Sequence, residues 1–456
     1  MESRTTSQIY DSSADVLAKN YVNGFPVPDL RLFRGSMFSW DSAIINEALA
    51  YENPYQAANN IRLAIRYQAP NGQLPNDVST GGRLGRLQSL VHQGNYGSSS
   101  PEHHTTSRIT QPPLLFDAAL EVGKHLPTDE RKRFYKDVFP PFKRYADFLL
   151  TERTDNDGLI INLHAYETGM DDTPPWAETM YANWENESEL VQLATAFCTA
   201  AINIGRHALT DCRPSLLHDR LPISDRASNM NVLVNWFQTR RLGKAGYELG
   251  AAMADPMITL IKDVGFNAIA AHAFASLQEI AEEIVDPAFT LDTELANKIG
   301  KQQRAVHKEL WDEKSQSYYS KNARNNQLIP IQTISSILPL MALPPKERQE
   351  KLVSDLFSGR KFDARFMAVP LDSVFHRPSY WQGMIWPMIE VAGAKALSAC
   401  GFVDEQQMIE DAALRRPHPE VKSEFRHPIT QVPLGTLGFG PAAGRDIIFI
   451  QHLKKQ

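Results

Sequence analysis

Residues 166–176 read YETGMDDTPPW and contain three carboxyl groups, at Glu167, Asp171 and Asp172, together with a glycine and two prolines. Glycine and proline disfavour a continuing helix, so this stretch is predicted to be a loop. An acid held beside Trp176 suits proton transfer to a sugar that stacks on the ring. The alternative is that Asp171 caps a turn and that Trp176 belongs to the core. Glu167 is expected to fix the loop by bonding backbone N–H groups or an arginine.

A second dense stretch, RPSYWQGMIWPMIE (377–390), has two tryptophans five residues apart, Trp381 and Trp386, beside Tyr380 and Gln382. One interpretation is an aromatic staple that fixes the start of a helix, since a proline follows in what would be its first turn. The other is a platform for the apolar face of a sugar, with Gln382 bonding its hydroxyls. Both interpretations can hold together.

In FSWDSAIINEAL (38–49), Asp41 follows Trp40 where an amphipathic pattern begins. As a helix N-cap, Asp41 would be ordinary. As a carboxylate beside an aromatic ring, it would also suit a pocket that grips sugar hydroxyls.

Glu424 precedes a loop rich in proline and glycine within residues 422–444. A single glutamate in a loop is usually solvated, but glycoside cleavage needs two carboxyl groups, one acid and one base or nucleophile. Asp171 and Glu424 are the pair best surrounded by aromatic and loop-forming residues. We therefore interpret them as a candidate catalytic pair.

The overall composition is typical of a soluble globular protein, with 43% hydrophobic and 22% charged residues among 456. The net charge of −6 is spread along the chain, which argues against a nucleic-acid-binding surface and a polybasic membrane anchor. The three cysteines, Cys198, Cys212 and Cys400, form no CxxC pair and indicate neither a disulfide framework nor a zinc site. With no signal-peptide pattern and no membrane-length apolar run, we expect a cytoplasmic protein.

Other chemistries have weaker support. The sequence contains no P-loop, no GxGxxG after a strand, no HExxH and no GxSxG. His103 and His104 could be metal ligands, but a plain loop or a substrate contact fits their polar surroundings better. TDNDGL (154–159) is faintly similar to a calcium loop, yet a tight turn explains it better because the downstream glutamate is missing. Neither a cofactor nor a metal is predicted.

Apolar residues recur at three- and four-residue spacing along most of the chain, which predicts about a dozen helices and few strands. The sequence therefore predicts an all-α protein in which paired helices form a single toroidal domain over residues 1–456. Two long polar segments, 76–110 and 210–230, are expected to be mouth loops or lids. The best strand candidates are 157–163 and 317–320. The predicted helices are 52–68, 111–126, 129–153, 187–208, 264–284, 291–312 and 382–399, with shorter ones near 41–50, 333–342, 346–357, 404–415 and 441–450.

The motifs occur in an order that resembles glycoside hydrolase family 63 and its trehalase-like relatives. The small members that hydrolyse mannosylglycerate or glucosylglycerate are most similar in length. The resemblance spans roughly residues 33–445. The motifs that carry it are Trp40-Asp41-Ser42, Gln111-Pro112-Pro113, Glu167-Thr168-Gly169-Met170-Asp171, Tyr380-Trp381-Gln382-Gly383 with Trp386-Pro387, and Glu424-Phe425 before His427-Pro428.

The resemblance implies an (α/α)6 barrel and hydrolysis of an α-glycosidic bond with inversion. It implies that Asp171 is the general acid and Glu424 the general base, about 6.5–9.5 Å apart so that a water fits between. The loop after the base departs from the family pattern, since His427 and Gln431 replace an asparagine and a glycine. The positions that match the sugar site are Trp40, Asp41, Gln111, Trp176, Trp381, Gln382 and Trp386, and Tyr380 is added from its motif.

The expected partner is a small carbohydrate substrate, and the sequence leaves the sugar, the aglycone and a homo-oligomeric state open. An anionic aglycone such as glycerate would need a cation. Two rival functions are a sugar epimerase or isomerase on a similar barrel, which would rely on paired histidines, and a non-hydrolytic carbohydrate-binding relative. The candidate cations are Arg83, Arg86, Arg108, Arg213 and Arg220.

Overall fold

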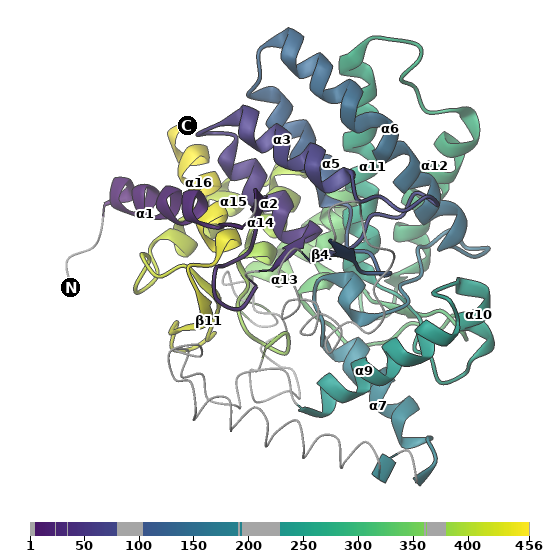
Figure 1. Ribbon diagram of the computed structural model, residues 1–456. Coiled ribbons are helices and arrows are strands. Elements are labelled where there is room, and N and C mark those ends of the chain that lie inside the picture. Colours follow the sequence, from purple (N-terminus) through teal and green to yellow (C-terminus); the bar gives the residue numbers. More distant parts are fainter. Residues whose placement is uncertain are drawn as a thin grey trace.

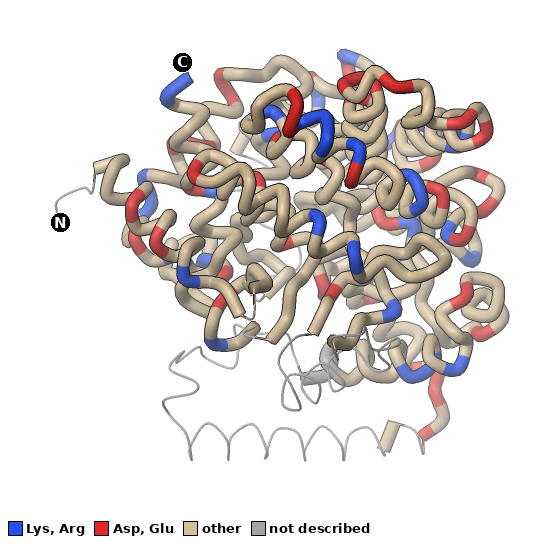
Figure 2. Tube along the Cα trace, turned by 45° about the horizontal axis from the view of Figure 1, so that its top comes forward, with Lys and Arg blue, Asp and Glu red and all other residues tan. Residues whose placement is uncertain are grey.

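A computed structural model shows that helices dominate the chain and that its strands are two to five residues long (Figure 1). This agrees with the predicted all-α class. No helix in the described part of the chain is long and apolar enough to cross a membrane. Charges of both signs are interspersed over the outer helices and loops (Figure 2). The structure describes residues 5–22, 24–33, 35–79, 104–189, 192–193, 229–359, 362 and 380–455.

Six inner segments form a closed ring. Each packs against the next along the chain, and the last packs against the first. The fourth segment is a short 3-10 helix, and the other five are α-helices. In chain order the inner segments are α2 (Ser39–Leu49), α5 (Leu114–Lys124), α11 (Val264–Ile284), η4 (Leu338–Ala342), α14 (Pro387–Ala399) and α16 (Gly440–Lys454).

Six outer helices surround this ring, and each precedes an inner segment in the chain. α1 packs on α16, α3 on α2 and α5, α6 on α5 and α11, α12 on α11, and α15 on α14. Arg348 of α13 donates to the His307 carbonyl of α12 at 2.7 Å, which places α13 beside α12. This double ring is the predicted (α/α)6 toroid. The outer helices are α1 (Thr6–Lys19), α3 (Pro54–Ile65), α6 (Thr128–Glu152), α12 (Thr293–Glu309), α13 (Lys346–Phe357) and α15 (Val403–Leu414).

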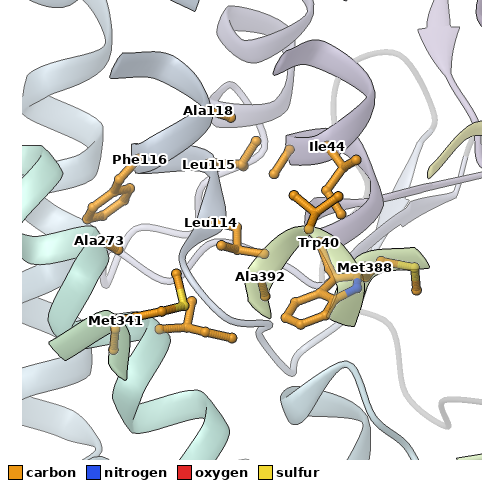
Figure 3. Close-up of a cluster of buried hydrophobic side chains, with 14 of the residues drawn as sticks. Trp40, Ile44, Leu114, Leu115, Phe116, Ala118, Ala273, Met341, Met388 and Ala392 are labelled. Carbon is orange, nitrogen blue, oxygen red and sulfur yellow. The ribbon is translucent and has the colours of Figure 1, made fainter. Parts of the chain in front are cut away.

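The inner helices are buried because they are apolar on almost every side. In α14, for example, ten of the thirteen residues are buried. Side chains from several inner segments meet in one cluster around Trp40, Leu114, Met341 and Met388 (Figure 3). Small residues let the helices approach closely: a Cβ at Gly444 of α16 would lie 3.0 Å from the Ile44 carbonyl oxygen of α2.

The shorter elements extend this frame. α7 (Pro174–Glu185), α9 (Asn229–Lys244) and α10 (Leu249–Ala254) lie between α6 and α11 in the chain and group on one side (Figure 1). β3 (Ser36–Phe38), β4 (Asp77–Ser79) and β5 (Thr105–Thr106) form an antiparallel sheet, and β10 (Ser423–Arg426) pairs antiparallel with β11 (Pro433–Leu437). The remaining elements are β1 (Tyr21–Val22), β2 (Phe25–Pro26), β6 (Ile261–Lys262), β7 (Trp311–Asp312), β8 (Ser317–Tyr318), β9 (Lys321–Asn322), η1 (Ala165–Thr168) and η3 (Ile334–Ser336).

Most predicted helices are confirmed, and the bounds of α11 and α13 are the predicted ones. The segment 333–342 is 3-10 helix instead of α-helix. The strand predicted at 157–163 is wrong, since only isolated bridges occur there; the one predicted at 317–320 begins with β8. α1, α7, α9 and α10 were not predicted. α7 was missed because its two prolines occupy the first helical turn, where a missing N–H costs nothing.

The predicted lids are only partly described. Segment 76–110 is described at its two ends, where β4 and β5 pair, and residues 80–103 lie outside the described residues. Of segment 210–230, only the last two residues are described, as the start of α9. The helix predicted at 187–208 lies mostly outside the described residues.

A buried charge cluster joins four of the inner helices. The Lys395 ammonium of α14 bonds Glu47 of α2 at 2.6 Å and also bonds Asp117 of α5. His272 of α11 contacts the second Asp117 oxygen at 3.2 Å. Burial alone would lower the pKa of Lys395, but the Asp117 and Glu47 carboxylates outweigh it and raise that pKa. Lys395 is therefore a cation, and it links α14 to α2 and α5.

Replacing Lys395 with methionine should lower the free energy of unfolding by about 3 kcal/mol, because two buried carboxylates would lose their cation. Chemical denaturation at neutral pH measures this. Lys308→Met is the control: Lys308 is 82% exposed and pairs with Glu309 at 3.1 Å, so its loss should cost under about 0.5 kcal/mol. Equal effects of the two substitutions would contradict the assigned role of Lys395.

Candidate active site

Glu167 fixes the loop that carries Asp171. Its carboxylate accepts the backbone N–H groups of Leu163 at 2.7 Å and Thr110 at 3.3 Å, and it pairs with Arg153 at 3.1 Å. Both Glu167 and Arg153 are buried. The expectation that Glu167 supports the loop through backbone N–H groups and an arginine is confirmed.

Gly169 lets this loop turn tightly against Trp40. Its φ is +75°, a region that favours glycine, and a Cβ there would lie 3.0 Å from Cδ2 of Trp40. The Trp40 backbone N–H in turn donates to Oε1 of Gln111 at 2.9 Å. The loop that carries Asp171 (residues 169–173, named the acid loop), the start of α2 and the residues before α5 therefore meet at one place.

Asp171 and Asp172 bind the acid loop to the segment before α14. The Tyr380 hydroxyl donates to Oδ2 of Asp171 at 3.1 Å. The Trp381 N–H donates to Oδ1 of Asp172 at 3.1 Å, and Nε2 of Gln382 donates to the Asp172 carbonyl at 3.1 Å. Two segments more than 200 residues apart are thereby held in register.

Burial sets the protonation of this loop. It raises the pKa of Asp171 to about 7, although the Tyr380 hydrogen bond works in the opposite direction. Burial also raises the pKa of Asp172 to about 7, opposed by a bond to Asn231. Burial lets the Asp171 carboxyl group hold a proton near neutral pH. Because the residue is also partly exposed, this group can still reach a substrate.

The aromatic residues before α14 form a rigid group. Trp381 and Trp386 stack with ring centroids 3.9 Å apart and planes 4° apart. Phe425 packs on Trp386 at 4.8 Å, and Tyr380 meets the same ring edge-on at 5.2 Å. Tyr380 has a φ of +42°, a strained conformation for a tyrosine, while Trp386 Nε1 donates to its carbonyl at 3.2 Å. The packing of its ring against Trp386 and Phe425 directs the Tyr380 hydroxyl toward Asp171.

Glu424 lies on β10 with its carboxylate over the partner strand. Oε2 accepts the Thr436 N–H at 3.1 Å. Gly435, with a φ of +75°, leaves the space for it, since a Cβ there would lie 2.6 Å from Oε2 of Glu424. The Ile385 N–H donates to the Arg426 carbonyl at 3.0 Å and links this hairpin to the segment before α14.

Three carboxyl groups share one region. The pKa of Asp41 is raised to about 8, first by burial and then by the negative charges of Glu424 and Asp171. Burial raises the pKa of Tyr380 well above its usual value, and the charges of Asp171 and Glu424 add to that effect. The contacts agree with this grouping. The Tyr380 hydroxyl bonds Asp171 at 3.1 Å, and its ring lies 5.9 Å from that of Phe425, the neighbour of Glu424. Trp40, the neighbour of Asp41, lies against Gly169 of the loop that carries Asp171. The arrangement can place two carboxyl groups around one scissile bond.

Gln111 and Gln382, which were predicted to contact the sugar, each make a hydrogen bond within the protein. Oε1 of Gln111 is bonded to Trp40, and Nε2 of Gln382 is bonded to the acid loop. Trp176 is fully buried and packs among Met180, Trp184 and Val234. This placement matches the core alternative for Trp176 and corrects the expectation that its ring offers a sugar-stacking surface.

The residues considered as metal ligands have structural partners. His104 Nδ1 lies 2.6 Å from the Tyr67 hydroxyl, and its ring packs edge-on against Phe25. His103 lies outside the described residues. In the segment 154–159, the Lys262 ammonium bonds Asp155 at 2.7 Å and Asp157 at 2.6 Å, so a lysine occupies the place of a cation. Among the described residues no group of three His, Cys, Asp or Glu side chains could hold a metal ion.

Several supporting residues were not predicted. Arg153 beside Glu167 and the Thr436 N–H beside Glu424 carry no local sequence signal, because each acts across the fold. Gly435 gave a weak signal as part of a loop rich in proline and glycine. Asp172 was recognised only as a neighbour of Asp171, although it makes the loop's contact with Trp381.

The sequence of this chain matches a known protein family and several of its members. Residues 35–435 match the family model described as the mannosylglycerate hydrolase MGH1-like glycoside hydrolase domain. The chain is 23% identical to a mannosylglycerate hydrolase of Rubrobacter radiotolerans, over 92% of each chain. It is also 23% identical to a glucosylglycerate hydrolase of Mycolicibacterium hassiacum, over 88% of each.

A similar fold occurs in the GH63 mannosylglycerate hydrolase of Thermus thermophilus, crystallised with Tris. The TM-score is 0.77 at 20% identity, covering 96% of this chain and 99% of that one. At this identity the likeness shows the fold, and it supports the (α/α)6 arrangement of the helices.

Replacing Asp41 with asparagine should change how stability depends on pH. Folded Asp41 keeps its proton up to about pH 8, whereas the unfolded residue loses it near pH 4, so its contribution to the free energy of unfolding falls as pH rises between these values. Relative to Asp41→Asn, the wild type should lose on the order of 2 kcal/mol between pH 5 and 8. Denaturant unfolding at both pH values measures this.

The control for this experiment is Asp137→Asn on α6, whose side chain is 54% exposed. That variant should keep the pH dependence of the wild type. If Asp41→Asn also keeps it, the raised pKa of Asp41 is contradicted.

Proposed function

This chain belongs to the mannosylglycerate hydrolase MGH1-like glycoside hydrolase family, and we propose that it hydrolyses an α-glycosidic bond in a small glycoside with inversion. Asp171 is the general acid and Glu424 the general base. The observation that carries the proposal is that Tyr380 connects the two carboxyl groups, since its hydroxyl bonds Asp171 and its ring packs against Phe425 beside Glu424. Their surroundings differ, because Glu424 accepts a backbone N–H from Thr436. Pairs of carboxyl groups with different environments divide acid and base roles in this way.

Asp171 is suited to donate a proton at neutral pH. Its pKa of about 7 keeps a large share of the carboxyl protonated. The Tyr380 hydroxyl occupies Oδ2, so Oδ1 is the oxygen that carries the proton toward the glycosidic oxygen. The rigid aromatic group behind Tyr380 keeps this assignment fixed during the reaction.

Glu424 completes the step from the opposite face of the sugar ring. It takes a proton from a water molecule, whose oxygen attacks the anomeric carbon while the bond to the leaving oxygen breaks. Asp171 supplies the proton that the leaving alcohol needs. The products are the inverted sugar and the alcohol, and both carboxyl groups return to their starting states by proton exchange with solvent.

Asp41 is the third carboxyl group of the site. With a pKa of about 8 it is mainly protonated at neutral pH, so it can both donate to and accept from sugar hydroxyls. A neutral Asp41 also avoids a further negative charge beside Glu424. We assign it to sugar binding. The Trp40, Trp381 and Trp386 rings are each at most 2% exposed and belong to the core, so, like Trp176, they support the site and do not offer the sugar-stacking surface that was expected of them.

The relatives named above support a substrate in which mannose or glucose is joined to glycerate. A glycerate carboxylate would need a cation. Arg108 is exposed, but its guanidinium donates to the Gly246 carbonyl at 2.8 Å and lies 5.0 Å from the Tyr247 ring centre. The other candidates, Arg83, Arg86, Arg213 and Arg220, lie outside the described residues.

Sugar release from mannosylglycerate, glucosylglycerate, trehalose and kojibiose tests the proposal. The wild type should release sugar from at least one of them. Asp171→Asn and Glu424→Gln should each lower kcat by about 10²–10⁴, because each removes one proton transfer. Their thermal unfolding should stay close to that of the wild type, since both substitutions keep the shape of the side chain.

Asp137→Asn is the control and should hydrolyse the substrate like the wild type. Turnover retained by Asp171→Asn or Glu424→Gln would contradict the assigned roles. A folded wild type that releases no sugar from any of these substrates would contradict the substrate class, and would favour the epimerase or binding alternatives.

A further inference from the structure

A buried group of charges lies behind the strand that carries Glu424, and we name it the β10 charge cluster. Its members come from α14, the turn after α15, β10 and its preceding residue, and α16. Each is at most 6% exposed. The cluster consists of the cations Arg416, Lys422, Arg426 and Arg445 and the carboxylates Glu390 and Asp446.

The two carboxylates are shared among three of the cations. Arg445 bonds Glu390 at 2.5 Å and Asp446 at 2.5 Å. The Lys422 ammonium bonds the other Asp446 oxygen at 2.5 Å, and Arg416 pairs with Glu390. Each carboxylate therefore serves two cations.

Arg426 is held by backbone carbonyls. Its guanidinium donates to the carbonyls of Pro417 at 2.8 Å, His418 at 2.9 Å, Val421 at 3.0 Å and Gln431 at 3.1 Å. These bonds join the turn before β10 to the end of the hairpin loop. Arg426 thereby fixes both sides of the strand without using a carboxylate of the cluster.

The cluster therefore carries four positive and two negative charges. Burial lowers the pKa of Arg426, and repulsion from Arg445 and Arg416 lowers it further, to about 10. Arg426 is still a cation at neutral pH. A buried excess of positive charge is unfavourable unless an anion lies close by.

Glu424 is the acidic residue of β10. It lies between Lys422 and Arg426 in the sequence; Asp446 of the cluster anchors Lys422, and backbone carbonyls on both sides of the strand anchor Arg426. We propose that the β10 charge cluster, through Lys422 and Arg426, positions Glu424 and keeps its carboxylate ionised for its role as the base. This inference rests on the proposed function, because it concerns the base of that reaction.

The groups on the other side of Glu424 act in the opposite direction. Asp41 from α2, Asp171 from the acid loop and Tyr380 from the segment before α14 face it, and any negative charge there favours its protonation. The cluster offsets this effect from behind the strand. Asp171 is held instead by the Tyr380 hydroxyl in an apolar setting, so the two carboxyl groups separate into acid and base.

Lys422→Gln tests the proposal. It removes one cation, while Asp446 keeps its pair with Arg445. The titration of the Glu424 carboxyl, followed by carbon NMR with ¹³C-labelled glutamate and assigned with Glu424→Gln, should move to higher pH by about one unit. The acid limb of the pH profile of kcat/KM should move the same way, and Lys422→Arg should restore both.

Lys395→Gln is the matched control, because it removes a cation from the other buried charge cluster. It should lower the unfolding temperature and leave the Glu424 titration in place. If Lys422→Gln does not fold, Arg416→Gln removes another cation while Glu390 keeps Arg445, and it should shift the titration upward too. The NMR titration needs no substrate, so failure to find a substrate leaves this test intact. Unfolding at lower temperature with an unmoved Glu424 titration would overturn the proposal.

Discussion

The site depends on three hydrogen bonds between the acid loop and the segment before α14. Tyr380 bonds Asp171, and the Trp381 backbone and the Gln382 side chain bond Asp172. These contacts cover the loop with aromatic rings, and the resulting burial raises the pKa of Asp171 to about 7. Position and protonation of the acid therefore have the same physical origin. The double ring of helices matters to the reaction because it brings these two distant segments together.

The two proposed catalytic carboxyl groups are held in different ways. Asp171 lies in a loop that turns on Gly169 and is supported from below by the buried Glu167–Arg153 pair. Glu424 lies on a short hairpin, with a backbone N–H on one oxygen and a buried excess of positive charge behind the strand. The first setting favours the neutral carboxyl, and in our proposal the second favours the carboxylate. In the proposed reaction this difference assigns the acid role to Asp171 and the base role to Glu424.

The helical class, the toroid and most helix positions could be predicted from the sequence, because apolar periodicity is a local signal. Asp171 and Glu424 were paired from their aromatic and loop-forming neighbours, and the order of the motifs then grouped them with Asp41. Trp176 shows the limit of local reasoning: a tryptophan beside an acid in a proline-rich stretch suits a sugar platform, yet here the prolines begin α7 and its ring is buried. The roles of Lys395 and Lys422 could not be predicted, since their partners lie elsewhere in the sequence.

The most direct test of the account is the configuration of the sugar when it is first released. Proton NMR of the anomeric signal, recorded before mutarotation, should show the β-anomer forming from an α-glycoside. That result is predicted if Glu424 activates a water on the face opposite Asp171. First release of the α-anomer would mean a covalent intermediate and a shorter separation of the carboxyl groups, and it would contradict the proposed roles of both residues.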